Sequence, residues 1–129
     1  MSYLKNKSDF NIIGAELLID NSLYSPSIHC SYYSVFQLMK TVYCDKKNIT
    51  FEDYSVQARN QEGSSHNTLI QNFCNLYPDR RESLKFSRRV RGLKASRIKS
   101  DYDNFQIDFD FSNKALAIAK ELILEIKNR

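Results

Sequence analysis

The sequence is short of the residues that make turns. Its 129 residues include only three glycines and two prolines. A many-stranded β fold needs a turn every few residues, so this scarcity favours long helices joined by few loops. The length suits one domain with a single core. We therefore expect one helical domain over residues 1–129, without a separate catalytic domain.

Metal- and nucleotide-binding motifs are also missing. The three cysteines, Cys30, Cys44 and Cys74, are far apart and form no Cys-x-x-Cys pair, and the two histidines have no metal-ligand spacing. We therefore expect reduced thiols, no metal and no cofactor. The absence of a Gly-x-x-x-x-Gly-Lys loop and of a Gly-x-Gly-x-x-Gly loop excludes the ordinary nucleotide-hydrolysis and dinucleotide folds.

Long apolar segments are lacking too. No run approaches the roughly 20 apolar residues that span a bilayer, and the N-terminal residues do not resemble a signal sequence. The sequence therefore predicts a soluble, cytoplasmic protein that does not associate with membranes.

Positive charge is concentrated in one segment. The net charge of the chain is +4, but residues 80–99 contain nine basic side chains and one acidic side chain, a net charge of +8. The other 109 residues hold ten basic and 14 acidic side chains, a net charge of −4. The protein is thus a mildly acidic body with one strongly basic segment, which is a candidate surface for following a nucleic-acid backbone.

Apolar periodicity predicts the helices. Residues 9–22 carry a stripe at Phe10, Ile13 and Leu17, which we expect to face the core, and residues 25–45 carry an aromatic-rich stripe that suits the centre of a bundle. Further helices are predicted over 51–59, 65–77, about 80–101, and from an N-cap at Ser112 to the C-terminus. The fold class is all-α, a four- to five-helix up-and-down bundle.

One arginine of the basic segment is placed differently from the others. In helical projection Arg97 falls within the apolar stripe of Phe86, Val90 and Leu93, with Asp101 one turn further along. The other cations lie mostly on the far side, and Gly92 is a point at which a bend would change this register. A buried arginine needs a partner, so Arg97 is either half of an internal ion pair with Asp101 or a phosphate ligand.

The two histidines offer weaker signals. His66 falls in the first turn of a predicted helix, where the helix dipole would favour the neutral imidazole. His29 precedes Tyr33 by one helical turn and can form a polar pair with it. Neither belongs to an evident Ser-His-Asp set.

Three blocks resemble small prokaryotic HEPN domain proteins. Residues 30–36, Cys-Ser-Tyr-Tyr-Ser-Val-Phe, resemble the family's Arg-Ala-Tyr-Tyr-Ala-x-Phe helix. Ser65-His66-Asn67 through Phe73 resembles its Ser-His helix start, and Arg97-x-x-x-Asp101-Tyr102 resembles its Arg-x-x-x-Asp-Tyr ending. The blocks occur in the family's order and cover most of the chain.

The resemblance implies a HEPN-like bundle that often forms a symmetric dimer. Relatives act as ribonuclease toxins, as partners of minimal nucleotidyltransferases in toxin–antitoxin pairs, or as non-catalytic RNA- or nucleotide-binding modules in defence systems. Active members have an arginine followed after four to six residues by a histidine. Here Arg97 matches that arginine, but no histidine follows it, and Cys30 replaces the arginine that precedes the Tyr-Tyr pair.

Three functions remain open on the sequence. The first is a homodimeric module that binds RNA or a nucleotide through the basic segment, with five nucleic-acid-binding candidates: Arg88, Arg89, Arg91, Lys94 and Arg97. The second is a metal-independent endoribonuclease in which Arg97 contacts the phosphate and Asp101, Tyr102 or His66 transfers protons. The third is a protein-interaction module in which Arg97 and Asp101 form a structural pair.

Overall fold

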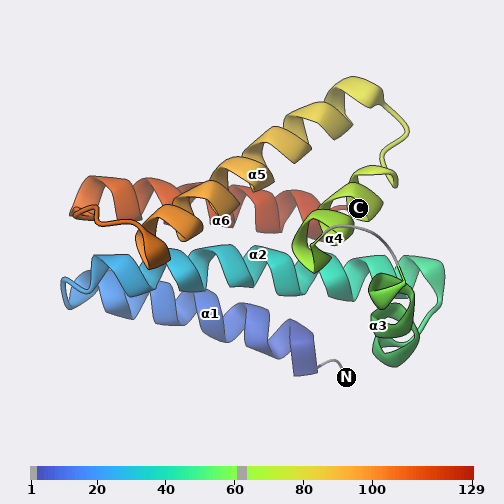
Figure 1. The fold of residues 1–129 in the computed structure, drawn as a ribbon, viewed down its shortest axis with the longest axis horizontal. Coiled ribbons are helices and arrows are strands. Elements are labelled where there is room, and N and C mark those ends of the chain that lie inside the picture. Colours follow the sequence, from blue (N-terminus) through green and yellow to red (C-terminus); the bar gives the residue numbers. More distant parts are fainter. Residues whose placement is uncertain (1–2, 61–63) are drawn as a thin grey trace.

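The computed structural model describes residues 3–60 and 64–129, and within these ranges the chain forms helices and no strands (Figure 1). This confirms the all-α prediction. Four long helices make up most of the bundle, and both shorter predicted segments are helices as well, so the described residues contain six. They are α1 (Tyr3–Asp20), α2 (Tyr24–Lys47), α3 (Phe51–Arg59), α4 (Ser65–Cys74), α5 (Arg80–Tyr102) and α6 (Phe109–Lys127).

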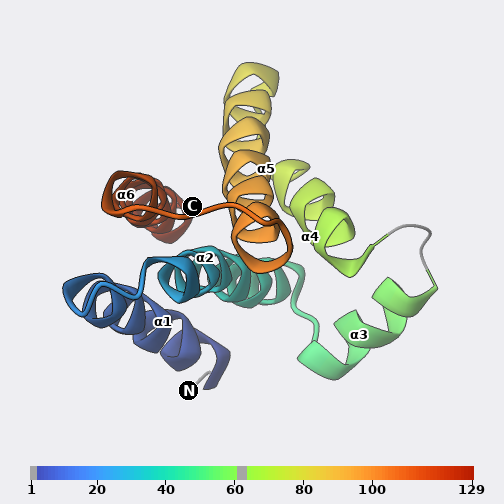
Figure 2. The same cartoon turned by 60° about the vertical axis from the view of Figure 1, so that its left-hand side comes forward.

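The central element is α2, which packs against α1, α4, α5 and α6. Figure 2 shows α1 and α6 on one side of it and α3 and α4 on the other. The predicted aromatic stripe of α2 does lie in the core, where Tyr32, Val35 and Met39 are fully buried. Burial of such side chains stabilises the bundle by roughly 1.5–3 kcal/mol each.

The prediction of which face of α1 packs against the core is wrong. Phe10, Ile13 and Leu17 are 68%, 54% and 56% exposed, whereas Ala15 and Ile19 are buried. The helix carries apolar residues on two faces, and the pattern alone does not say which one meets the bundle.

The buried face of α1 also holds a polar residue. Ser8 is buried and its hydroxyl donates a hydrogen bond to the carbonyl oxygen of Ser34 in α2, at 2.6 Å. A buried polar group paired in this way fixes the register of the two helices.

The start of α6 differs from the sequence prediction. The helix begins at Phe109, and the Asp108 carboxylate caps it by accepting a hydrogen bond from the Phe111 amide at 2.9 Å. The predicted cap, Ser112, is fully buried one turn inside the helix and donates to the carbonyl oxygen of Phe109. Aspartate and serine are both good N-caps. The sequence therefore does not distinguish a helix start at Asp108 from one at Ser112.

The projection of α5 is correct. The helix runs from Arg80 to Tyr102 without a break at Gly92, and Phe86, Val90 and Leu93 are buried. Arg97 is buried with them at 9% exposure.

Replacing Gly92 with alanine should stabilise the protein. A Cβ at this position would meet no atom within 4 Å, and alanine is better than glycine inside a helix by about 1 kcal/mol. We expect Gly92→Ala to raise the free energy of unfolding by about that amount in urea denaturation. A loss of stability would show that α5 needs the conformational freedom of glycine here.

Within the described ranges, no helix combines the length and the apolar character that a membrane crossing requires.

Candidate functional site

Arg97 lies against two tyrosine rings of α2. Its guanidinium carbon is 5.3 Å from the ring centre of Tyr32 and 5.6 Å from that of Tyr33. The arginine comes from the inner face of α5 and the tyrosines come from the centre of α2, so the contact joins the two helices. The cation–π contacts offset part of the free-energy cost of burying the guanidinium charge.

The predicted pair with Asp101 is present. Arg97 Nη1 lies 3.5 Å from Asp101 Oδ2, and the same oxygen lies 3.2 Å from His29 Nδ1. Arg97 Nε is buried and has no hydrogen-bond partner among the described residues. A guanidinium has five N–H donors, so the Asp101 contact leaves part of its hydrogen-bonding capacity unused.

His66 is brought to the same tyrosines from α4. Its Nδ1 lies 2.7 Å from the Tyr32 hydroxyl oxygen, and its ring stacks on Phe36 with ring centres 4.4 Å apart. Its ring also makes an edge-to-face contact with Tyr33, with ring centres 5.7 Å apart. His66 and Arg97 are 31 positions apart in the sequence, yet both contact Tyr32 and Tyr33.

Burial lowers the pKa of His66 below its usual 6.5, and the positive charges of Arg97 and Lys94 lower it further. The imidazole is therefore neutral at physiological pH. The position of His66 in a first helical turn predicted a neutral ring through the helix dipole, whereas the causes in the fold are burial and the two cations of α5.

A second polar contact joins α5 to the start of α4. Lys94 Nζ donates to Asn67 Oδ1 at 2.8 Å, and Arg91 Nη1 reaches the same oxygen at 3.4 Å. Asn67 is held by the first turn of α4, where its amide donates to the Ser64 hydroxyl oxygen. Burial lowers the pKa of Lys94, and repulsion from Arg97 and Arg91 lowers it further.

Arg91, Lys94 and Arg97, which we call the cation cluster, lie three residues apart on α5 and pass from its exposed to its buried face. Among the described acidic side chains, only Asp101 forms an ion pair with a member of the cluster. Arg91 and Lys94 share the neutral amide oxygen of Asn67, so three cations are accompanied by a single carboxylate, which pairs with Arg97. This leaves a local excess of positive charge that an anion would neutralise. Arginine is well suited to binding a phosphate or carboxylate through two parallel hydrogen bonds.

The other predicted site residues lie elsewhere. Arg89 faces α6 and forms ion pairs with Glu121 at 2.8 Å and Glu125 at 2.9 Å, so its charge is already matched. Arg88 is exposed and Tyr102 is 74% exposed at the end of α5. The five basic candidates therefore do not form one continuous surface. Arg91 and Lys94 contact Asn67 at the start of α4, and Arg97 lies against the two tyrosines that also contact His66.

Several side chains of the site were not predicted as site residues from the sequence. Tyr32 and Phe36 belong to the aromatic-rich stripe of residues 25–45, which predicts a core position, and Asn67 is part of the Ser-His-Asn block. The rings of His29 and Tyr33 are in contact with centres 4.6 Å apart, but the polar partner of His29 is Asp101 and not the predicted Tyr33. The Tyr-Tyr and Ser-His-Asn blocks were the available signal, because both meet Arg97 or Lys94 in the fold.

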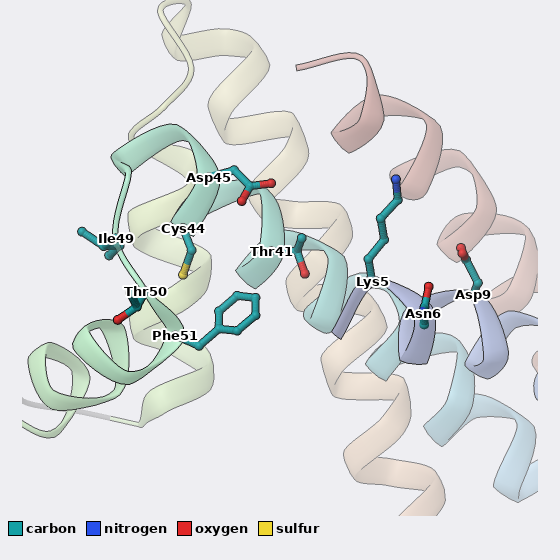
Figure 3. A pocket seen from close by; sticks show the side chains of 9 residues that line it. All are labelled: Lys5, Asn6, Asp9, Thr41, Cys44, Asp45, Ile49, Thr50 and Phe51. Carbon is teal, nitrogen blue, oxygen red and sulfur yellow. The ribbon is translucent and has the colours of Figure 1, made fainter. Parts of the chain in front are cut away.

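The structure has a pocket next to His66 and a larger pocket away from the cation cluster. A pocket of about 460 Å³ adjoins His66 and is lined by Phe36, Lys40, Tyr54, Ser55, Ala58, Arg59 and Ser65 as well. A larger one of about 800 Å³ lies between the start of α1, the end of α2 and the start of α3 (Figure 3). Its lining mixes Lys5 with Asp9 and Asp45, so it lacks the charge excess of the cation cluster.

The described residues contain no group of three or more His, Cys, Asp or Glu side chains placed to hold a metal ion.

The pKa of His66 predicts a pH effect on stability. The unfolded chain takes up a proton near pH 6.5, whereas folded His66 does so only at lower pH. The free energy of unfolding should therefore fall as the pH drops below about 6.5. Urea denaturation of the wild type and of His66→Gln at about pH 7.5 and about pH 5.5 measures this. The loss should be smaller in His66→Gln; an equal loss in both proteins would contradict the prediction.

No protein-family model matches the chain, and none of the curated proteins or solved structures compared with it does either.

Proposed function

We propose that this chain is a HEPN-like module that binds RNA or a nucleotide through phosphate, with Arg97 as the central ligand. The observation that carries the proposal is the cation cluster, in which Arg91 and Lys94 contact one amide oxygen and Arg97 pairs with one carboxylate. A toxin–antitoxin or defence setting, with a minimal nucleotidyltransferase as partner, fits the motif resemblance and is part of the same proposal.

The aromatic side chains next to the cluster support nucleic acid over a simple inorganic anion. Tyr33 is half-buried and lies beside Arg97 and His66. A base next to a bound phosphate can stack on such a ring, and one stacked base contributes roughly 1–3 kcal/mol. Phosphate contacts supply the remaining affinity and make it depend on salt.

Two lysines of α5 provide a matched test. Lys94 belongs to the cation cluster, whereas Lys85 is exposed outside it on the same helix. Lys94→Gln should weaken the binding of a short single-stranded RNA about tenfold, as expected for the loss of one charge-assisted contact. Lys85→Gln should leave binding nearly unchanged. Equal effects of the two variants in fluorescence anisotropy would place the RNA elsewhere on the basic segment.

A second candidate is a metal-independent endoribonuclease. The observation that favours it is the neutral imidazole of His66 beside Arg97. A neutral imidazole can take the proton of a ribose 2′-hydroxyl, and an arginine can stabilise the charge that develops on the attacked phosphate. In the same RNA assay with EDTA present, this candidate requires shortened products that disappear in His66→Gln while binding is kept. If the wild-type protein leaves the RNA intact, the endoribonuclease candidate is excluded and RNA binding remains the proposed function.

A further inference from the structure

An apolar surface lies on the side of the bundle formed by α1 and α6. It consists of Phe10, Ile13 and Leu17 of α1 and Leu124 of α6, and these side chains are 54–68% exposed. Their positions on α1, three and four residues apart, place them on one face of the helix. Clustered large apolar side chains that one chain leaves exposed usually mark an interaction surface.

Between the two helices lies a groove with an apolar lining. Its volume is about 370 Å³, and Ile12, Ile13, Ile123 and Leu124 line it together with charged side chains. The charges are divided between the helices, because Asp9 belongs to α1 whereas Lys120 and Lys127 belong to α6. One rim of the groove is therefore acidic and the other is basic.

The charges also follow a common order along the groove. Glu16 pairs with Lys120 at 3.1 Å. Asp9, seven residues before Glu16 on α1, and Lys127, seven residues after Lys120 on α6, line the same groove. Because α1 and α6 run in opposite directions, each acidic residue of α1 has a basic residue of α6 at its own level. The apolar residues Ile13 and Leu124 lie between these two levels.

We propose that this surface binds a second copy of the chain, with a twofold axis that runs along the groove. Such an axis places α1 of each copy on α6 of the other and keeps the levels aligned. Asp9 then faces Lys127 of the second copy, Glu16 faces its Lys120, and Ile13 meets its Leu124. The same contacts form twice, as an isologous dimer requires, and the charges are complementary at each level.

The alternative twofold axis, perpendicular to the helices, gives a poorer fit. It would place α1 against α1, so that the side carrying Asp9 and Glu16 would face the same acidic side of the second copy. Like charges facing each other across an interface oppose association. Charge complementarity thus selects the arrangement in which α1 meets α6.

The proposed interface leaves both cation clusters free. Arg97 lies between α5 and α2, near the start of α4, whereas α1 and α6 face away from α3 and α4 in Figure 2. The two Arg97 side chains of the dimer would therefore not converge across its seam. This inference does not depend on the proposed phosphate function, and the two can fail separately.

Charge reversal tests the interface. Sedimentation velocity of the wild-type full chain should show a dimer. The dissociation constant of this dimer should rise at least about tenfold in Asp9→Lys and in Lys127→Glu, because each change acts twice in a symmetric dimer. Mixing the two variants should restore dimers, since the lysine introduced in one copy then faces the glutamate introduced in the other, and the native pair remains at the second contact. Both positions are exposed, so circular dichroism should show an unchanged fold.

Two controls sharpen the test. Leu124→Glu, a change at an exposed position, should also dissociate the dimer, whereas Lys114→Glu, which lies on α6 outside the groove, should not. A wild-type chain that stays monomeric at high concentration would overturn the proposal. A dimer that survives Asp9→Lys and Leu124→Glu would overturn it as well, because the copies would then meet on another surface.

Discussion

Arg97→Met should weaken the binding of single-stranded RNA about 100-fold while the protein stays folded. An arginine that binds phosphate through two charge-assisted hydrogen bonds contributes roughly 3 kcal/mol, which corresponds to this factor. Methionine keeps much of the apolar volume next to Tyr32 and Tyr33 but carries no charge and no donor. Isothermal titration calorimetry and urea denaturation of the same preparation measure affinity and stability together.

The effect of Arg97→Met on stability should be small. Replacing a buried ion pair with a packed apolar residue is often neutral or stabilising, and the change removes a buried Nε that has no partner among the described residues. Asp101 keeps its contact with His29. Normal RNA affinity in the variant would contradict the role of Arg97 as a ligand and would favour the purely structural pair.

Phe73→Ala should destabilise the protein by about 3–5 kcal/mol, the cost usually measured for this change in a core. Phe73 is fully buried in α4, and its ring centre lies 5.1 Å from that of Phe86 in α5. The loss is a large share of the roughly 5–15 kcal/mol that stabilises a typical domain. The midpoint of urea denaturation should fall with little change in its slope.

Phe73→Ala should also disturb the geometry of the candidate site, because it loosens the packing of the helices that supply the site. Phe73 packs α4 against α5, and the two sides of the site, His66 with Asn67 and Lys94 with Arg97, come from these two helices. Phe73→Leu serves as the control, because it roughly conserves volume and should cost less than about 1.5 kcal/mol. A small cost for Phe73→Ala would mean that this part of the core is not tightly packed.

Much of the fold follows from local pattern. The placement of Arg97 in the core was predictable because the apolar residues of α5 define one stripe and the arginine falls within it. The pair with Asp101 followed because residues four apart lie on the same face of a helix. These predictions need only the geometry of a single helix.

The errors have a different physical origin, because they depend on which helices become neighbours. Phe10, Ile13 and Leu17 form a regular stripe, but an amphipathic pattern does not distinguish a face that meets the core from one left exposed by a single chain. Arg89 was predicted to bind nucleic acid, and its pairing with Glu121 and Glu125 becomes visible only when α5 and α6 are placed together.

The site itself was only partly predictable. Its cations were recognisable from the charge of residues 80–99, and His66 was named as one candidate for proton transfer. That His66 and Asn67 meet α5 depends on how the short helix α4 packs against α2 and α5. Neither spacing nor charge along the chain contains that information.

The salt dependence of RNA binding tests the central claim, that the cation cluster contacts phosphate. The double variant Lys94→Gln/Arg97→Met should flatten the plot of log affinity against log salt concentration by about 1.4, because each phosphate contact on a single strand contributes about 0.7 to the slope. The control Lys85→Gln/Lys114→Gln removes the same charge and should keep the wild-type slope. Equal slopes for the two double variants would contradict the account.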